Sequence, residues 1–302
     1  MLRKTLLWMS GSRRLRHWME QSRLSQQVTG RFVAGITLAD EVHILRKLAA
    51  EGISSSADFL GENVRSLEEA QYSRKNYLDA LEQIRDLPAT VSIKLTQFGL
   101  DFSADACFEN ASTLVARAAD SGTRVEVDME SSEYTQRTLD VVCRLQQAFP
   151  GHVRVAIQAY LHRSEDDVRL LGERQIPVRL CKGAYREPAS VAFARKDQVD
   201  ANYLKLTRLL LNEGTYPAIA SHDEAVIRET LRHVAENRIA TDCFEFQMLY
   251  GIRRDLQREL VTKGHRLRLY VPYGDAWYPY FMRRLAERPA NVLFIARNLV
   301  RK

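Results

Sequence analysis

The chain alternates between short strand-like runs and longer amphipathic segments, and this alternation limits its possible folds more than any other feature. Eight runs are rich in β-branched and aromatic residues, which favour strands. Helical patterns such as DDVRLLGER lie between them, so each run is followed by enough chain for the crossover that parallel strands require. The runs span residues 53–60, 91–96, 124–129, 153–159, 177–183, 216–222, 243–249 and 267–273.

Eight such units in one chain favour a closed barrel over an open, doubly wound sheet. An open sheet commonly binds a dinucleotide through a G-x-G-x-x-G turn, and this sequence contains no such turn and no Walker A motif. We therefore expect an α/β fold with a (β/α)8 barrel over residues 51–302 and an N-terminal helical region over residues 1–50. A cofactor would have to be held in some other way.

The net charge of +6 is concentrated near the two ends of the chain, so the middle of the chain is acidic. This distribution argues against a basic nucleic-acid groove across the body of the protein. It leaves open a basic N-terminal arm that touches an acidic surface such as anionic lipid. No run approaches the roughly 20 apolar residues of a membrane span, and the four cysteines are too far apart to suggest a metal site or disulfides. We expect a cytoplasmic protein without a metal.

Large polar side chains stand near the carboxyl ends of most of the predicted strands. In a (β/α)8 barrel these ends meet at one rim, where the active site lies. Packing alone does not explain such a set, because each buried charge needs a partner. Lys94 and Asp128 could also form a structural ion pair between neighbouring strands. The set comprises Lys94, Asp128, Gln158, Arg179, Lys182, His222, Gln247 and Tyr270.

Two adjacent arginines follow the last predicted strand. The stretch YFMRRLAER places Arg283 and Arg284 on a predicted helix, with Glu287 one turn further on. Both arginines can reach the rim if this helix tips over the barrel mouth. Cations then exceed anions at the rim, and arginine binds carboxylate or phosphate through two parallel bonds. The residues therefore predict a barrel enzyme with an anionic substrate, and an aldolase or isomerase that uses a Schiff-base lysine on a phosphorylated substrate is an alternative.

The motifs on these elements also resemble those of a known family, the proline dehydrogenases. The resemblance covers residues 53–300, and RFVAG at 31–35 is similar to the bacterial single-function form. Any one motif is weak, but seven in the right order, each on its expected strand, are specific. The chain is too short for the fused aldehyde dehydrogenase that some members carry, so a monofunctional enzyme is expected. The motifs are VSIKLTQFGL, VEVDME, AIQAY, VRLCKGAY, ASHD, FEFQML and RLYVPYGDAWYPYFMRRLAE.

The resemblance implies a distorted (β/α)8 barrel that holds FAD and oxidises L-proline to Δ1-pyrroline-5-carboxylate. Hydride would pass from the ring carbon beside the nitrogen to flavin N5, and a membrane quinone would then accept the electrons. A separate pyrroline-5-carboxylate dehydrogenase would be its metabolic partner. A peripheral contact with the inner membrane fits a lipid-soluble acceptor, and no nucleic acid is expected as a partner.

The resemblance also implies roles for individual residues. Asp128 and Arg179 match the catalytic positions, and Glu287 would hold one of the neighbouring arginines in place. The substrate-binding positions are matched by Lys94, Tyr270, Arg283 and Arg284. The FAD-binding positions are matched by Met129, Gln158, Arg179, Lys182, Gly183, Ala184, Ser221 and His222.

Overall fold

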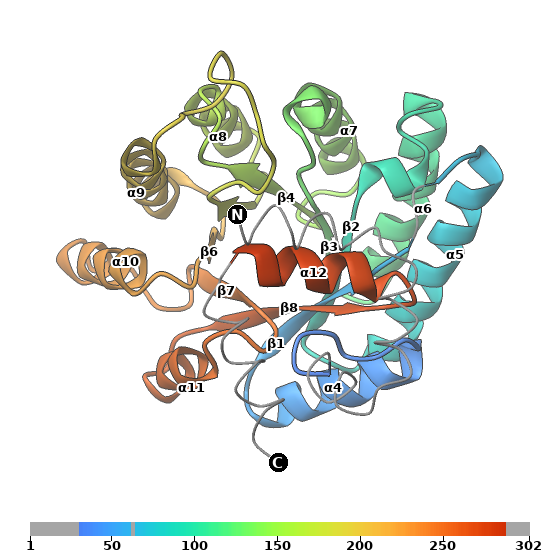
Figure 1. The fold of residues 1–302 in the computed structure, drawn as a ribbon, viewed down its shortest axis with the longest axis horizontal. Coiled ribbons are helices and arrows are strands. Elements are labelled where there is room, and N and C mark those ends of the chain that lie inside the picture. The colour runs from blue at the N-terminus through green and yellow to red at the C-terminus, as the bar shows by residue number, and fades with distance from the viewer. Residues whose placement is uncertain (1–29, 62–63, 288–302) are drawn as a thin grey trace.

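Eight parallel strands close into a barrel in which each strand pairs with its neighbours in sequence and β8 pairs with β1 (Figure 1). The structure is a computed structural model that describes residues 30–61 and 64–287, with side chains as far as Met282. The predicted barrel and all eight predicted strands are confirmed. The strands are β1 (Ser54–Phe59), β2 (Ala89–Ile93), β3 (Val125–Val127), β4 (Val153–Gln158), β5 (Val178–Cys181), β6 (Ala218–Ala220), β7 (Glu245–Leu249) and β8 (Leu267–Tyr273).

Helices surround this barrel, and side-chain caps define where several of them begin. Thr37, Ser66, Ser103 and Asp223 each accept a bond from a backbone N–H in the first turn, which satisfies donors that a helix start leaves open. Two short 3-10 turns, η1 (Leu95–Phe98) and η2 (Ser132–Tyr134), follow β2 and β3. The surrounding helices are α4 (Leu38–Ala50), α5 (Leu67–Ile84), α6 (Ala104–Asp120), α7 (Thr135–Ala148), α8 (Ser164–Glu173), α9 (Lys196–Glu213), α10 (Glu224–Glu236) and α11 (Arg254–Thr262).

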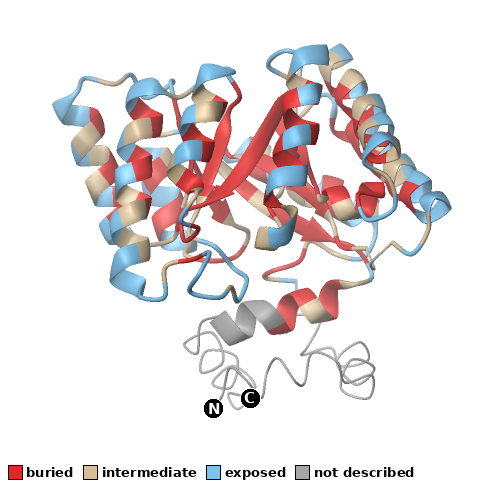
Figure 2. Ribbon diagram, turned by 90° about the horizontal axis from the view of Figure 1, so that it is seen from above, coloured by how far each residue is buried: buried red, intermediate tan, exposed pale blue. Residues whose placement is uncertain are grey.

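The helix after β8 departs from the regular pattern. In a regular barrel it would pack beside β8 and β1, but here α4 packs against both of these strands. The helix that follows β8, α12 (Trp277–Glu287), instead lies across the mouth of the barrel (Figures 1 and 2). Because β8 ends four residues before α12 begins, this mouth is the carboxyl rim of the strands. The barrel is therefore distorted, as the resemblance implied.

A separate apolar cluster holds α12 in place. Gly274 donates its backbone N–H to the carbonyl of Gly35 at 3.0 Å, and Ala276 donates to the carbonyl of Leu60 at 3.2 Å. The helix then buries aromatic side chains against the segment before α4 and the ends of β1 and β7. Burying apolar surface stabilises a fold by about 25 cal/mol for each Å² removed from water, so these contacts hold α12 against the barrel. The cluster comprises Phe32, Val33, Leu60, Ile252, Trp277, Tyr278, Tyr280, Phe281 and Met282.

The prediction that residues 280–288 are helical is confirmed as far as Glu287. Arg283 and Arg284 therefore lie on a helix over the barrel mouth, while their side chains and residue 288 lie outside the described part. For the predicted N-terminal helical region, α4 is described and residues 1–29 are not. The boundary near residue 50 stays a proposal, although α4 packs against β1 and β8 and so completes the helical layer of the barrel. None of the helices within the described residues is long and apolar enough to cross a membrane.

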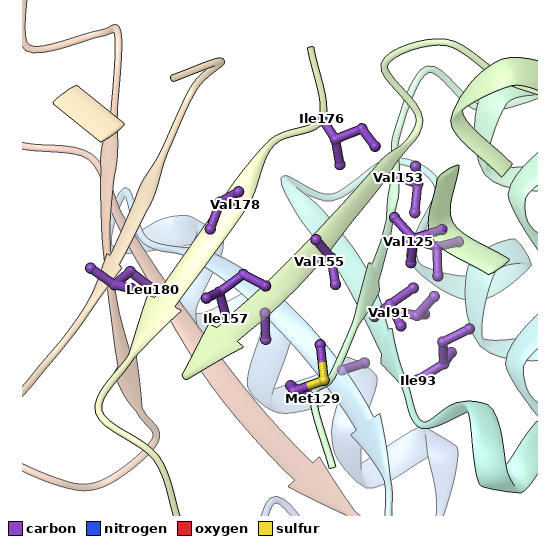
Figure 3. Packing of buried hydrophobic residues seen from close by; sticks show 14 of the residues in the cluster. Val91, Ile93, Val125, Met129, Val153, Val155, Ile157, Ile176, Val178 and Leu180 are labelled. Carbon is purple, nitrogen blue, oxygen red and sulfur yellow. The ribbon is translucent and has the colours of Figure 1, made fainter. Parts of the chain in front are cut away.

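The main hydrophobic core lies between the strands and the surrounding helices. Val91, Val125, Val153 and Val178 belong to this cluster and are buried (Figure 3). Successive side chains of a strand point to opposite faces, so the alternate positions of the same strands face the inside of the barrel. Those positions are largely polar and buried, and they include Ser56, Ser92, Glu126, Arg154, Arg179, Glu245 and Gln247. Barrels of this kind are usually filled by branched aliphatic side chains, so the polar interior needs its own explanation.

Candidate active site

A network of buried charges occupies the lower part of the barrel interior. Arg154 Nη1 lies 2.9 Å from Glu126 Oε1 and 2.5 Å from Glu245 Oε1. Arg268 Nε lies 2.9 Å from the same oxygen of Glu245. Burial alone raises the pKa of Glu126 and of Glu245, but the neighbouring arginines outweigh it and hold both pKa values below the usual range. These carboxylates are therefore ionised, and the network forms a charged floor beneath the rim.

The sequence analysis did not single out this floor. Its signal was nevertheless present in VEV, VRV, FEF and LRL, where one charged residue stands between two apolar ones on β3, β4, β7 and β8. On a strand buried on both faces, such a residue must point into the barrel and find a partner there.

Lys94 is the centre of a second group of charges, at the rim. Its Nζ donates to Asp58 Oδ1 at 2.9 Å, to Asp128 Oδ2 at 3.2 Å and to the hydroxyl oxygen of Tyr270 at 3.3 Å. The hydroxyl of Tyr270 in turn donates to Asp128 Oδ2 at 2.7 Å. A lysine ammonium has three N–H donors, so all three are used. The suggested ion pair between Lys94 and Asp128 is present, and Asp58 is a site residue that the sequence analysis missed.

Arg179 joins the rim group to the charged floor. It donates to Asp128 Oδ1, to Ser92 Oγ at 3.3 Å and to Glu126 Oε2 at 3.4 Å. Its guanidinium also lies 5.6 Å from the centre of the Tyr270 ring, within the range of a cation–π contact. The guanidinium is buried, and its position is set by contacts with β2, β3 and β8.

The protonation states of this group limit its chemistry. Burial acts to raise the pKa of Asp128, but the charges of Arg179 and Lys94 outweigh it and lower that pKa. Burial acts to lower the pKa of Lys94, but Asp58, Tyr270 and Asp128 outweigh it and hold that pKa well above its usual range. Asp128 is therefore an ionised acceptor of three donors, which makes it a poor base. Lys94 stays an ammonium, which disfavours the Schiff-base alternative, since that chemistry needs a neutral amine.

A cavity of about 590 Å³ opens above these groups. This volume lies in the range of about 300–1,000 Å³ that is typical of cofactor and substrate sites. Its walls include every predicted site residue whose side chain is described. These are Lys94, Asp128, Met129, Gln158, Arg179, Lys182, Gly183, Ala184, Ser221, His222 and Tyr270. Gln247, which also belonged to the predicted rim, lies there too, together with apolar side chains of Met248, Leu249 and Ile252.

The loop after β5 brings backbone close to this cavity. Gly183 has φ +119°, and a β-carbon there would lie 2.3 Å from Cδ1 of Tyr160, so the position requires glycine. The next residue, Ala184, donates its N–H to Gln158 Oε1 at 3.3 Å, while Gln158 Nε2 donates to the carbonyl of Glu130 at 2.8 Å. Gln158 thus ties the loops after β3 and β5 together at the cavity wall.

The ends of β6 and β7 form the opposite wall. The backbone N–H of Leu249 donates to Nε2 of His222 at 2.9 Å. This nitrogen accepts a bond, so the imidazole is neutral and its proton is on Nδ1. Ser221 donates its backbone N–H to the carbonyl of Gln247 at 3.2 Å, and its hydroxyl accepts from the N–H of Asp223. The histidine and the serine are therefore fixed at the wall by backbone groups.

The expected excess of cations over anions is not found among the described residues. Lys94 pairs with Asp58 and Asp128, Arg179 pairs with Glu126 and Asp128, and Lys182 pairs with Asp200 and Asp223. The sequence analysis counted the rim residues but not the carboxylates on β1 and at the starts of α9 and α10. An anionic substrate must therefore find its cations elsewhere, and Arg283 and Arg284 are placed over this mouth.

Comparisons with known proteins agree with this arrangement. Residues 42–297 match a family model described as proline dehydrogenase. The chain is 38% identical over its whole length to proline dehydrogenase 1 of Bacillus subtilis subsp. natto, which it also covers completely. It is 37% identical to the proline dehydrogenase of Deinococcus radiodurans, over 90% of this chain and 89% of that protein.

Solved structures show the same fold. A crystal structure of proline utilization A (PutA) from Bdellovibrio bacteriovorus, inactivated by N-propargylglycine, matches with a TM-score of 0.81 and 26% sequence identity. The match covers 87% of this chain but only 33% of that longer chain. The present chain therefore spans about a third of the PutA protein.

Proposed function

The chain belongs to the proline dehydrogenase family and is an enzyme that oxidises proline, and on this premise we propose that it is FAD-dependent and forms Δ1-pyrroline-5-carboxylate. The observation that carries the proposal is the cavity at the barrel mouth. Residues on or directly after β2, β3, β4, β5, β6 and β8 that match the family's substrate and FAD positions line it together.

The cavity fits a flavin in size and in chemistry. Met248, Leu249 and Ile252 offer an apolar wall for a flat ring system, while Lys182 and the loop at Gly183 offer cationic and backbone groups to the polar parts of the cofactor. Bound there, FAD would supply the hydride acceptor for the ring carbon beside the proline nitrogen, and a membrane quinone would take the electrons. We propose that Met129, Gln158, Arg179, Lys182, Gly183, Ala184, Ser221 and His222 hold it.

For the substrate, we propose that Arg283 and Arg284 bind the carboxylate, with Lys94 at its other side. Each charge-assisted bond contributes roughly 1.5–3 kcal/mol. Lys94 already makes three bonds, but the 3.3 Å bond to Tyr270 is the longest of them and can be exchanged for a carboxylate oxygen. Tyr270 would lie against the proline ring. Holding the ring at several points decides which of its carbons faces the acceptor.

Asp128 and Arg179 would organise the reacting end of the site. Asp128 orients Lys94, Tyr270 and Arg179 at once. A hydride leaves the ring carbon readily only when the neighbouring nitrogen has lost its proton. Because Asp128 is ionised and already accepts bonds from three donors, we propose that this proton passes to solvent, so the rate rises with pH.

The proposed partners follow from the chemistry. A quinone is lipid-soluble, so a peripheral contact with the inner membrane of a protein otherwise in the cytoplasm is part of the proposal. The product would be passed to a separate pyrroline-5-carboxylate dehydrogenase. No helix among the described residues spans a membrane, and the basic residues 1–25 are candidates for the lipid contact.

One experiment tests the proposal. The purified protein is denatured and any released cofactor is identified by its mass, and the intact protein is given L-proline and a soluble quinone. FAD at about one per chain and formation of Δ1-pyrroline-5-carboxylate, identified by mass spectrometry, are expected. Protein without flavin that is instead trapped by borohydride with a keto-substrate would support the Schiff-base enzyme.

A further inference from the structure

We propose that Asp58 is a positioning residue of this enzyme, which acts through Lys94 to fix the side chains beside the substrate. The proposal rests on the proposed substrate site and extends it to a residue that does not line the cavity. Asp58 lies near the end of β1, and only 1% of its side chain is exposed. It thus stands behind Lys94, whose side chain is 28% exposed and reaches the cavity.

The hydrogen bonds of Lys94 indicate why the carboxylate of Asp58 matters for the site. Its shortest bond, at 2.9 Å, goes to Asp58, and its other two bonds go to Asp128 and Tyr270, which both line the cavity. If a substrate oxygen replaces one of the longer bonds, the bond to Asp58 is the one that keeps the ammonium in place. The bond between Lys94 and Asp58 is therefore the one that stays in place, while a bond of Lys94 on the cavity side can be exchanged for a substrate oxygen.

Asp128 cannot take over this task. It already accepts bonds from Tyr270 and Arg179 in addition to Lys94. If the charge of Asp58 were lost, the ammonium would be drawn toward Asp128 and would disturb the hydroxyl of Tyr270 and the guanidinium of Arg179. These are the groups that we place beside the reacting ring.

Other charged and titratable groups surround Asp58, and they do not replace its carboxylate. Glu41 on α4 is an acid, and Tyr77 on α5 and Tyr273 on β8 are phenols. Tyr270 on β8 also has a side-chain hydrogen bond to Asp58, and Asp128, directly after β3, is engaged as described. Lys94 is the cation that pairs with Asp58. Removing the charge of Asp58 therefore acts on Lys94 first.

The direct test is a double-mutant cycle on the FAD-loaded enzyme, with Asp58→Asn, Lys94→Gln and both together. Asparagine keeps the size and an acceptor oxygen but removes the charge. We expect Asp58→Asn to lower kcat for L-proline about tenfold, because the reacting end is misplaced, and to raise KM as well, because Lys94 also binds the carboxylate. In the Lys94→Gln background the same change should alter kcat less than about twofold, since the ammonium that Asp58 positions is absent.

A purely structural role would give a different pattern. It would lower yield or thermal stability while kcat and KM per bound flavin stayed at their wild-type values. Glu41→Gln is the matched control, because Glu41 is also a fully buried acid but makes no hydrogen bond to the site, and its kcat and KM should be unchanged.

Two results would overturn the proposal. One is wild-type kcat in folded Asp58→Asn, and the other is a second loss of about tenfold when Asp58→Asn is added to Lys94→Gln. If Asp58→Asn alone does not fold, the comparison of Lys94→Gln with the double variant decides, because removing both charges leaves the interior balanced. A wild-type protein that holds flavin but does not oxidise proline would instead count against the proposed function.

Discussion

Tyr270 and Asp128 are 142 positions apart in the chain, yet the tyrosine hydroxyl donates to Asp128 Oδ2 at 2.7 Å. The bond crosses the barrel interior from β8 to the residue directly after β3, and these two strands are not neighbours. Lys94 bonds to both residues, so the three side chains form a closed triangle at the rim. Barrel closure, rather than any local motif, creates this part of the site.

The first prediction concerns that triangle. Tyr270→Phe removes a bond to a charged group, which contributes roughly 1.5–3 kcal/mol, so kcat/KM for proline should fall by about tenfold to a hundredfold. Flavin content should stay near normal. Steady-state kinetics per bound flavin measure the effect. Tyr77→Phe is the control, because Tyr77 is fully buried and bonds to Gln97 outside the cavity; an equal loss in both variants would contradict the assignment.

The second prediction concerns the helix over the mouth. Arg283→Ala or Arg284→Ala should raise KM for proline steeply, at a cost of about 2–5 kcal/mol if the carboxylate is left buried and unpaired. The flavin content of both variants should be close to that of the wild type. Arg232→Ala on α10 removes an exposed arginine between Glu229 and Glu236 and should leave KM unchanged. Unchanged proline kinetics in both helix variants would refute the proposed carboxylate site.

The third prediction concerns the loop after β5. Gly183→Ala places a β-carbon 2.3 Å from Tyr160 in a backbone conformation with φ +119°, so the loop must move and the cavity wall with it. We expect the purified variant to contain less than about a tenth of the normal flavin. Gly264→Ala also has positive φ, at +80°, but meets no atom within 4 Å, and it should keep its flavin. Comparable flavin loss in the two variants would mean that strain alone is responsible.

The fourth prediction concerns Glu41, whose two carboxyl oxygens are buried without a hydrogen-bond partner. Burial, with a smaller effect of Asp58, raises its pKa well above the usual 4.5. The folded state therefore holds a proton that the unfolded chain releases, so stability is full below about pH 4.5 and falls as pH rises. Glu41→Gln removes this dependence. Above about pH 4.5, the free energy of unfolding of Glu41→Gln relative to wild type should therefore rise by up to about 1.4 kcal/mol for each pH unit.

Thermal unfolding between pH 4 and pH 8 measures this difference. Glu109→Gln, at an exposed position of α6, is the control and should give a constant offset. A constant offset for Glu41→Gln as well would show that the buried carboxyl is already ionised in the folded protein.

Much of the fold could be predicted because its information is local. Eight β-branched runs with helical segments between them specify the barrel, and the polar residues at strand ends specify the rim. The site residues Lys94 and Asp128 stood out since each directly follows a buried strand. Asp58 lies instead inside β1, one residue before its end. Most residues of this strand, SSSADF, are small rather than β-branched, so Asp58 did not stand out as a charge at the end of a buried strand.

Two features could not be predicted because they depend on packing between distant segments. The charged floor forms because four residues meet across the barrel: Glu126, Arg154, Glu245 and Arg268. The spacing of these residues in the sequence does not predict that they meet. The place of α12 depends on α4 taking the position beside β1 and β8. The sequence could say only that the arginines reach the rim if the helix tips over it.

The central claim is that the barrel mouth holds a flavin and a proline whose carboxylate is bound by cations. The most direct measurement is the absorption spectrum of the purified protein without oxygen, before and after addition of L-proline or of pyrrolidine, which lacks the carboxylate. The account predicts a yellow protein that L-proline bleaches rapidly and pyrrolidine bleaches at least a hundredfold more slowly at equal concentration. A colourless protein, or a yellow one whose spectrum L-proline leaves unchanged, would contradict it.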